Sequence, residues 1–267
     1  MSGPRAELAA VRGADSIGGV PPAPDRLATA YQESRKDLLG YLTRMVVRVD
    51  VAEELVQEAA LRLLQTEKPP ADAEGTRAWL FRVATNLAID HLRRHSTWRE
   101  TVLIDARERA KVDQAFIAES RLLAGSPEMR AIAREHLAVC FSCTLRNVPP
   151  EQAAALLLAE VYGFTVREAA EFLGATFGQA KNWIQGARAR LHEKYATTCA
   201  LITKQGVCYQ CVELSEFFTG RKDNPLDGTT KDVDARLAIL RERRAAELGP
   251  WHRQMMRIID DILGTSG

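Results

Sequence analysis

The chain has 267 residues, of which 46% are hydrophobic, and 36 basic residues nearly balance 35 acidic ones to leave a net charge of +1. This hydrophobic content excludes wholesale disorder, and a total charge near zero still permits separate basic and acidic surfaces. No apolar run approaches the roughly 20 residues of a membrane-spanning helix, and the N-terminus lacks the apolar core of a signal peptide. We therefore expect a cytoplasmic protein without membrane insertion.

Composition and spacing predict an all-α protein. Aromatic residues make up only 6% of the chain, while the helix formers Ala, Leu, Glu and Arg are abundant. Apolar residues recur at intervals of three and four over two long blocks. We predict two helical domains joined by a linker, plus a mostly helical C-terminal extension, in this order: flexible arm (1–25), first domain (26–98), charged linker with room for one helix (99–125), second domain (126–196) and extension (197–267).

The first domain contains an amphipathic helix with an acidic outer face, from Asp50 to Leu64. Asp50 is predicted as its N-cap, with Glu53 three residues later as in a capping box. The apolar spacing predicts five inward side chains, namely Leu55, Val56, Ala59, Leu63 and Leu64. The acidic face by itself fits either an ordinary solvated surface or a docking surface.

The helix predicted next, from Arg77 to Arg99, has the opposite charge, with five arginines and one acidic residue. Arginine neutralises phosphates, and aromatic rings offer faces on which unpaired bases stack. The aromatic residues here are Trp79, Phe81 and Trp98. Two interpretations stay open at this point: nucleic-acid binding, or aromatic residues in the core with arginines in solvent.

These two motifs together resemble region 2 of the extracytoplasmic-function (ECF) sigma factors. The resemblance rests on D-V-A-E-E-L-V-Q-E followed by R-A-W-L-F-R-V-A-T-N-L-A-I-D-H-L-R-R. It implies that the acidic helix docks on core RNA polymerase through Glu53, Glu54, Gln57 and Glu58. It also implies that the basic helix captures and melts the −10 promoter element through Trp79, Arg82, Asn86, Asp90, Arg93 and Arg94.

The second domain has the pattern of a helix-turn-helix. Thr165 and Glu168 predict a capping box for a short helix. Gly174 provides the turn, after which Thr176 begins a longer basic helix through Leu191. In such a motif the N-terminal residues of the second helix enter the major groove, and later basic residues contact phosphates.

This stretch, including T-V-R-E-A-A-E-F-L-G-A-T-F-G-Q-A-K-N-W, resembles region 4 of the same family. The resemblance implies contact with the −35 promoter element through Thr176, Gln179, Lys181, Asn182, Gln185 and Arg188. Phe177 and Trp183 depart from the smaller or polar residues expected at their positions. No base preference is therefore carried over from the family.

Five cysteines include two C-x-x-C pairs, Cys140 with Cys143 and Cys208 with Cys211, and Cys199 in addition. Four thiolates satisfy a tetrahedral zinc ion, so the two pairs are candidate ligands, with Cys199 ranked behind them. Redox-active dithiols and unliganded thiols are the alternatives. The function implied by the resemblance requires no cofactor.

The predicted function is that of an alternative sigma factor, which binds core RNA polymerase and directs promoter recognition, melting and transcription initiation. The alternative is a helix-turn-helix regulator that acts on DNA without core polymerase. A thiol- or metal-dependent enzyme is disfavoured, because the chain has no Ser/His/Asp grouping and no phosphate-binding loop. The extension is interpreted as a regulatory gate or as a stabilising cap, and an anti-sigma factor is left open as a further partner.

Overall fold

The computed structural model describes residues 23–95, 102–124, 128–199, 232–244 and 250–264, and these ranges contain helices but no strand, which confirms the all-α prediction. The helices are α1 (Ala23–Val46), α2 (Val49–Gln65), α3 (Ala73–Arg94), α4 (Val102–Val112), α5 (Gln114–Ala124), α6 (Met129–Leu145), α7 (Pro150–Glu160), α8 (Val166–Phe172), α9 (Phe177–Thr198), α12 (Val233–Glu242) and α13 (Pro250–Leu263). The proposed domain boundaries remain predictions.

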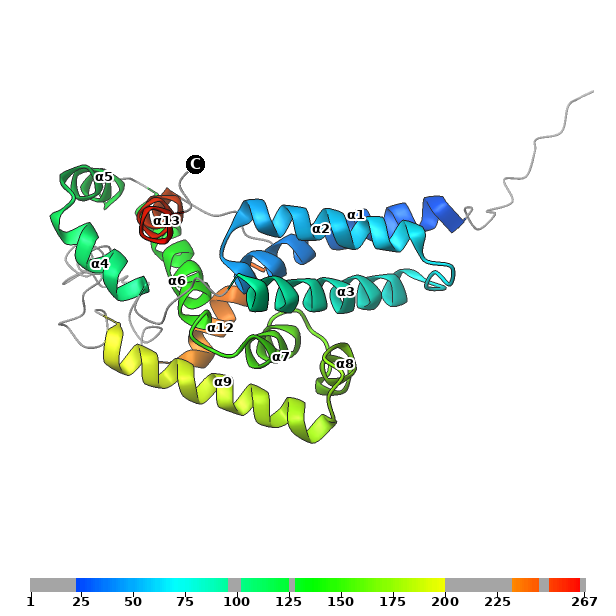
Figure 1. Cartoon of the computed structure of the whole chain (residues 1–267). Coiled ribbons are helices and arrows are strands. Elements are labelled where there is room, and N and C mark those ends of the chain that lie inside the picture. Colours follow the sequence, from blue (N-terminus) through cyan, green and yellow to red (C-terminus); the bar gives the residue numbers. More distant parts are fainter. Residues whose placement is uncertain (1–22, 96–101, 125–127, 200–231, 245–249, 265–267) are drawn as a thin grey trace, which may run out of the picture.

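Helices α1, α2 and α3 lie side by side as a three-helix bundle (Figure 1). In α2 the buried residues recur at three- and four-residue spacing, at Ala52, Val56, Ala59 and Leu63, so this stripe faces α1 and α3. The prediction for Leu64 was wrong, because its side chain is 68% exposed. Leu64 follows Leu63 by about 100° around the helix, which carries it off the buried stripe.

The predicted cap of α2 was also wrong. The helix begins at Val49, with Arg48 at the N-cap position and no side-chain cap bond. Asp50 instead pairs with the Arg48 guanidinium at 3.0 Å. The hydrogen bond from Arg48 holds the pKa of Asp50 below its ordinary value. A charge-assisted contact of this kind is stronger than a neutral hydrogen bond, so the contact with Arg48 has the largest effect on this carboxylate, which also accepts from the backbone at Val51 and at Asp50 itself.

The segment predicted as a linker contains two helices, α4 and α5, and α13 packs on both (Figure 1). Their buried faces include Ala106, Ala110 and Phe116. The side-chain amide of Gln254, in α13, donates to the Phe116 carbonyl oxygen at 2.8 Å. The sequence of this segment is highly charged and only weakly periodic. Its helices are therefore stabilised by packing on α13, which lies more than a hundred residues away in the sequence.

The helix-turn-helix consists of α8 and α9, supported by α7. The predicted capping box of α8 is confirmed, since Thr165 and Glu168 exchange side-chain and backbone hydrogen bonds. A second capping box, of Thr176 with Gln179, begins α9. Gly174 has a φ of +61° at the turn, a conformation that glycine adopts without steric cost.

An aromatic cluster joins the three-helix bundle to the helix-turn-helix. Tyr162 follows α7, and its ring centroid lies 5.4 Å from that of Tyr41 in α1 and 5.5 Å from that of Phe81 in α3. Phe164 lies 4.9 Å from Phe81. Phe81 is fully buried, so of the two interpretations left open for this residue the core position is correct, and its ring is not available for base stacking. Its position on the inner face of α3 makes it part of the core shared by both domains.

Candidate functional site

The outer face of α2 carries the predicted acidic residues. Glu53, Glu54 and Gln57 are exposed. Glu58 is paired with Arg62 at 2.7 Å on the same helix. Their placement suits contact with a basic surface.

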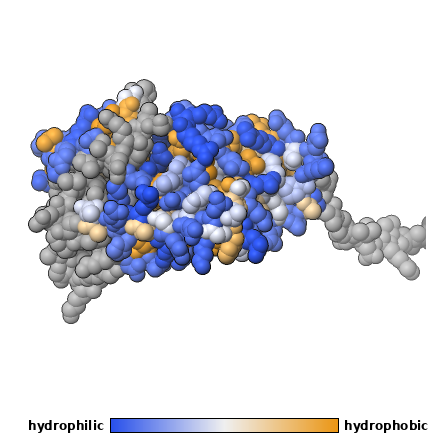
Figure 2. Space-filling model, turned by 60° about the horizontal axis from the view of Figure 1, so that its bottom comes forward, coloured by the Kyte–Doolittle hydropathy of each residue, from blue (hydrophilic) through white to orange (hydrophobic). Residues whose placement is uncertain are grey.

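Two leucines extend this acidic face toward the end of α2. Leu61 is 53% exposed and Leu64 is 68% exposed. The face of the molecule shown in Figure 2 is mainly hydrophilic, with small separate hydrophobic patches. Sequence reasoning missed these leucines as surface residues, although the helical angle between Leu63 and Leu64 would have separated them.

The predicted polar residues of α3 form one exposed stripe. Arg82, Asn86, Asp90 and Arg94 follow one another at four-residue spacing and are all exposed, so they lie on one face of the helix. Trp79 is half-buried and packs against the core. Trp98 lies outside the described residues. The stripe thus keeps Arg82 and Asn86 available, and Arg94 lies 3.9 Å from the Asp90 carboxylate. Among the aromatic residues that the structure describes here, Trp79 keeps a partly exposed ring for stacking.

Arg93, the remaining predicted residue of α3, is paired across the molecule. Its guanidinium lies 2.6 Å from the Glu151 carboxylate in the first turn of α7. The neighbouring Arg77 donates to the Tyr162 carbonyl oxygen at 2.7 Å and lies over the Phe164 ring. Burial lowers the pKa of Arg77 from its ordinary value. The basic helix is therefore held against the helix-turn-helix.

The second helix of the helix-turn-helix presents Lys181, Asn182 and Gln185 to solvent. These residues occupy its N-terminal half, where a recognition helix contacts bases. Thr176 and Gln179 are exposed too, but their side chains form the capping box of α9. Phe177 is 51% exposed, with the Arg167 guanidinium 5.9 Å from its ring centroid.

Thr176→Ala should lower the free energy of unfolding by about 1 kcal/mol, because the Gln179 backbone N–H loses its acceptor. Chemical denaturation of the DNA-free protein measures the change. Thr176→Ser keeps the hydroxyl and should stay close to the wild type. Equal stability of the alanine and serine variants would contradict the capping role.

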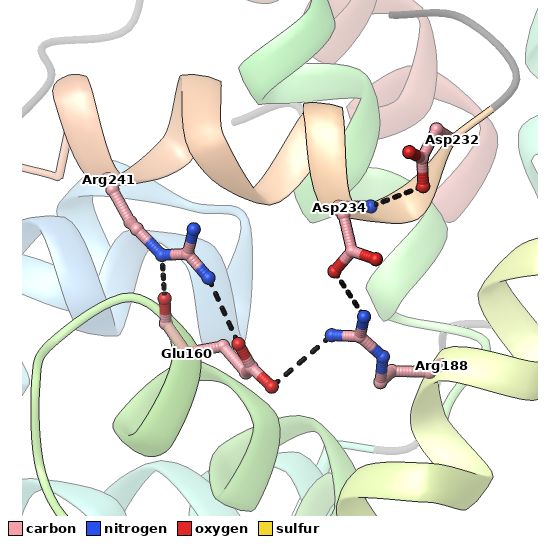
Figure 3. A network of polar contacts seen from close by, with 5 residues as sticks. All are labelled: Glu160, Arg188, Asp232, Asp234 and Arg241. Carbon is pink, nitrogen blue, oxygen red and sulfur yellow. Dashed lines mark hydrogen bonds and ion pairs between the residues drawn. The ribbon is translucent and has the colours of Figure 1, made fainter.

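Arg188 differs from the exposed residues of α9, because it is half-buried and its guanidinium is paired with carboxylates of the protein. Its guanidinium contacts the Glu160 carboxylate at 3.2 Å and the Asp234 carboxylate of α12 (Figure 3). Arg241 of α12 contacts the other oxygen of Glu160 at 3.0 Å. Arg188 is therefore the predicted −35 residue that the C-terminal extension contacts directly.

The cysteine hypotheses are tested only in part, because Cys208 and Cys211 lie outside the described residues. Cys140 is half-buried, Cys143 and Cys199 are buried, and within the described ranges no three His, Cys, Asp or Glu residues gather as a metal site. The fully buried Arg236 of α12 donates to the sulfur atoms of Cys140 and Cys199, at 3.9 and 3.3 Å. Sequence spacing gave no signal for this shared contact.

Two families match this chain in succession. Sigma-70 region 2 matches residues 30–97, and sigma-70 region 4 matches residues 138–191. The first range holds α2 and α3 with the acidic face and the polar stripe, and the second holds α7, α8 and the greater part of α9. None of the helices that the structure describes is long and apolar enough to cross a membrane.

Several relatives are similar over more than half of this chain. The chain is 26% identical over 170 residues to a probable ECF RNA polymerase sigma factor SigI of Mycobacterium tuberculosis, covering 63% of this chain and 55% of the relative. It is 28% identical to the ECF RNA polymerase sigma factor SigG of the same organism, covering 59% and 45%. The ECF RNA polymerase sigma factor SigX of Bacillus subtilis is 25% identical, covering 54% and 70%. The chain thus spans about half the length of the two mycobacterial relatives.

Proposed function

Because this chain carries sigma-70 regions 2 and 4 and belongs to the ECF sigma factors, we propose that it binds core RNA polymerase and directs it to promoters. The observation that supports this most directly is the order and exposure of the surfaces. An acidic docking face, a polar stripe with arginines and a helix-turn-helix follow one another along the chain, each with exposed residues. A helix-turn-helix regulator without polymerase leaves the first two surfaces without a role.

The outer face of α2 is the proposed polymerase contact. Glu53, Glu54 and Gln57 supply exposed polar groups, and Leu61 and Leu64 supply apolar area beside them. A charged rim steers association and sets orientation, while buried apolar contact slows dissociation. This combination suits a basic helical surface on the polymerase.

The stripe on α3 is the proposed −10 contact. Arg82 and Arg94 would neutralise phosphates, while Asn86 and Asp90 offer hydrogen bonds to the edges of unpaired bases. Trp79 lies one turn before Arg82 and presents a partly exposed ring for stacking. Melting one strand requires such a mixture, because both the backbone and the separated bases must be held.

In α9, Lys181, Asn182 and Gln185 are the proposed −35 contacts, since they are exposed at the beginning of the recognition helix. An amide such as Asn or Gln pairs with adenine in the major groove, and lysine contacts guanine or phosphate. Thr176 and Gln179 position the helix through the capping box. The proposed role of the protein as a whole is to bind polymerase and DNA and to position them, not to catalyse a reaction. This role needs no cofactor and is carried out in the cytoplasm, where DNA and polymerase are found.

Run-off transcription tests the proposal. Purified protein and core polymerase from a related bacterium are incubated with genomic DNA fragments, and the expected result is discrete transcripts only when both are present. DNA footprints by the protein alone, without any effect of polymerase, would instead support the regulator. Absence of polymerase binding in a pull-down would overturn the proposal.

A further inference from the structure

The residues that follow helix α12 are hydrogen-bonded to α1 of region 2. Arg44, in α1, donates to the carbonyl oxygens of Arg243 and Arg244 at the end of α12. The Tyr162 hydroxyl donates to the Arg244 carbonyl at 2.9 Å. Burial raises the pKa of Tyr162, so the phenol keeps its proton for this bond. Gly40 allows the approach, because a Cβ at this position would lie 1.9 Å from the Arg244 oxygen.

The same helix also holds region 4. Asp234 contacts Arg188 of α9, and Arg241 contacts Glu160 at the end of α7, as Figure 3 shows. Glu160 also contacts Arg188, so the four side chains form one chain of alternating charge. Helix α12 packs mainly on α6 and also contacts α9. Because its side chains pair with α7 and α9 and the residues that follow it are bonded to α1, it joins the two DNA-binding regions.

Helix α13 adds a second bridge. Asp260 contacts Arg48, in the turn between α1 and α2, at 2.7 Å. Arg257 contacts Glu119 of α5, and Asp261 contacts Arg109 of α4 at 3.3 Å. The segment between the two regions is therefore fixed by the extension as well.

This closed arrangement is incompatible with simultaneous contact to both promoter elements. Helices α3 and α9 both pack on α7, and packed helices lie about 8–10 Å apart, so their axes are separated by roughly 20 Å. Elements centred at −10 and −35 are roughly 25 base pairs apart, or about 85 Å along B-form DNA. In addition, Arg93 and Arg188 are paired with protein carboxylates.

We propose that α12 and α13, together the C-terminal clasp (Val233–Glu242 and Pro250–Leu263), hold regions 2 and 4 in a closed state that must open before promoter DNA is bound. Asp234 takes the place of a DNA phosphate on Arg188, and the contacts with Arg44 keep region 4 on region 2. The clasp is thus an autoinhibitory contact within the chain. Its effect on transcription rests on the proposed function.

Two features of the clasp limit the free energy needed to separate it from regions 2 and 4. Arg236 places a charged side chain in the buried face of α12, and removing a charge from water offsets much of what its contacts contribute. At α13, a solvent-open cavity of about 350 Å³ separates part of this helix from the ends of α1 and α3, so α13 is not closely packed there. The ion pairs at the surface of the clasp are each weak and sensitive to salt.

Gly40→Ala tests the clasp in the full-length protein. Alanine favours the helix, so α1 itself is not weakened, but the new methyl group must displace the end of α12. Fluorescent amino acids at the exposed positions Gln65 and His192 report the distance between region 2 and region 4. The variant should populate longer distances than the wild type, and its run-off transcription should rise about ten-fold. Lys36→Ala, exposed on the same helix, is the control and should change neither.

A second variant keeps the proposal testable if Gly40→Ala folds poorly. Asp234→Asn combined with Arg241→Gln removes two exposed ion pairs of the clasp and should raise transcription about two- to ten-fold. Lys111→Gln, which removes an ion pair within α4, is the matched control.

Unchanged distances in both clasp variants would overturn the clasp, and so would longer distances with unchanged transcription. A third outcome is that the variants show longer distances but neither they nor the wild type support transcription. This result would support the clasp and overturn the proposed sigma function.

Discussion

Replacing Glu53 and Glu54 together by lysine is expected to lower polymerase-dependent transcription at least about 100-fold, because like charges brought together across an interface cost several kcal/mol. Both side chains are exposed, so the folded protein should be unaffected. Association with core polymerase, followed by surface plasmon resonance, should fall in parallel. The helical circular-dichroism spectrum and the midpoint of urea unfolding should not change, since neither side chain is buried.

Glu67→Lys provides the control for this experiment. Glu67 is exposed just beyond the end of α2. Its replacement by lysine therefore changes the net charge of the protein without altering the proposed docking face. A loss of polymerase binding in this variant equal to that of the double variant would show a general charge effect. Retention of binding in the double variant would remove α2 from the interface.

Phe81→Ala is expected to lower the free energy of unfolding by about 3–5 kcal/mol, the largest effect of a single substitution proposed for this protein. Phe81 is fully buried and contacts the rings of Tyr41, Tyr162 and Phe164. Its truncation leaves a cavity at the junction of region 2 and region 4. Urea unfolding followed by circular dichroism measures the loss.

Phe177→Ala is the matched control, because it removes the same side chain from an exposed position. A change within about 0.5 kcal/mol is expected there, as for most surface substitutions. If the two variants were destabilised equally, the aromatic cluster could not be the common core of the two regions. If Phe81→Ala lost DNA binding but kept its stability, the result would indicate that Phe81 stacks on unpaired bases and does not support the core.

Local signals account for the parts of this protein that sequence reasoning predicted correctly. Apolar spacing predicts α2 and α3, the pair Thr165–Glu168 marks the beginning of α8, and Thr176 marks the beginning of α9. Such signals depend on residues within one or two helical turns, which the order of amino acids states directly. The two family motifs are local in the same sense, so the family followed from the sequence alone.

Tertiary structure decided which residues face one another over long separations. Phe81 was open to core or surface until the rings of Tyr162 and Phe164 were found beside it. The hydrogen bond from Arg44 to Arg244 joins residues 200 positions apart, and no periodicity encodes such a pair. Because packing between distant helices depends on the shape and charge of whole surfaces, only the folded chain shows that the extension holds the two DNA-binding regions together.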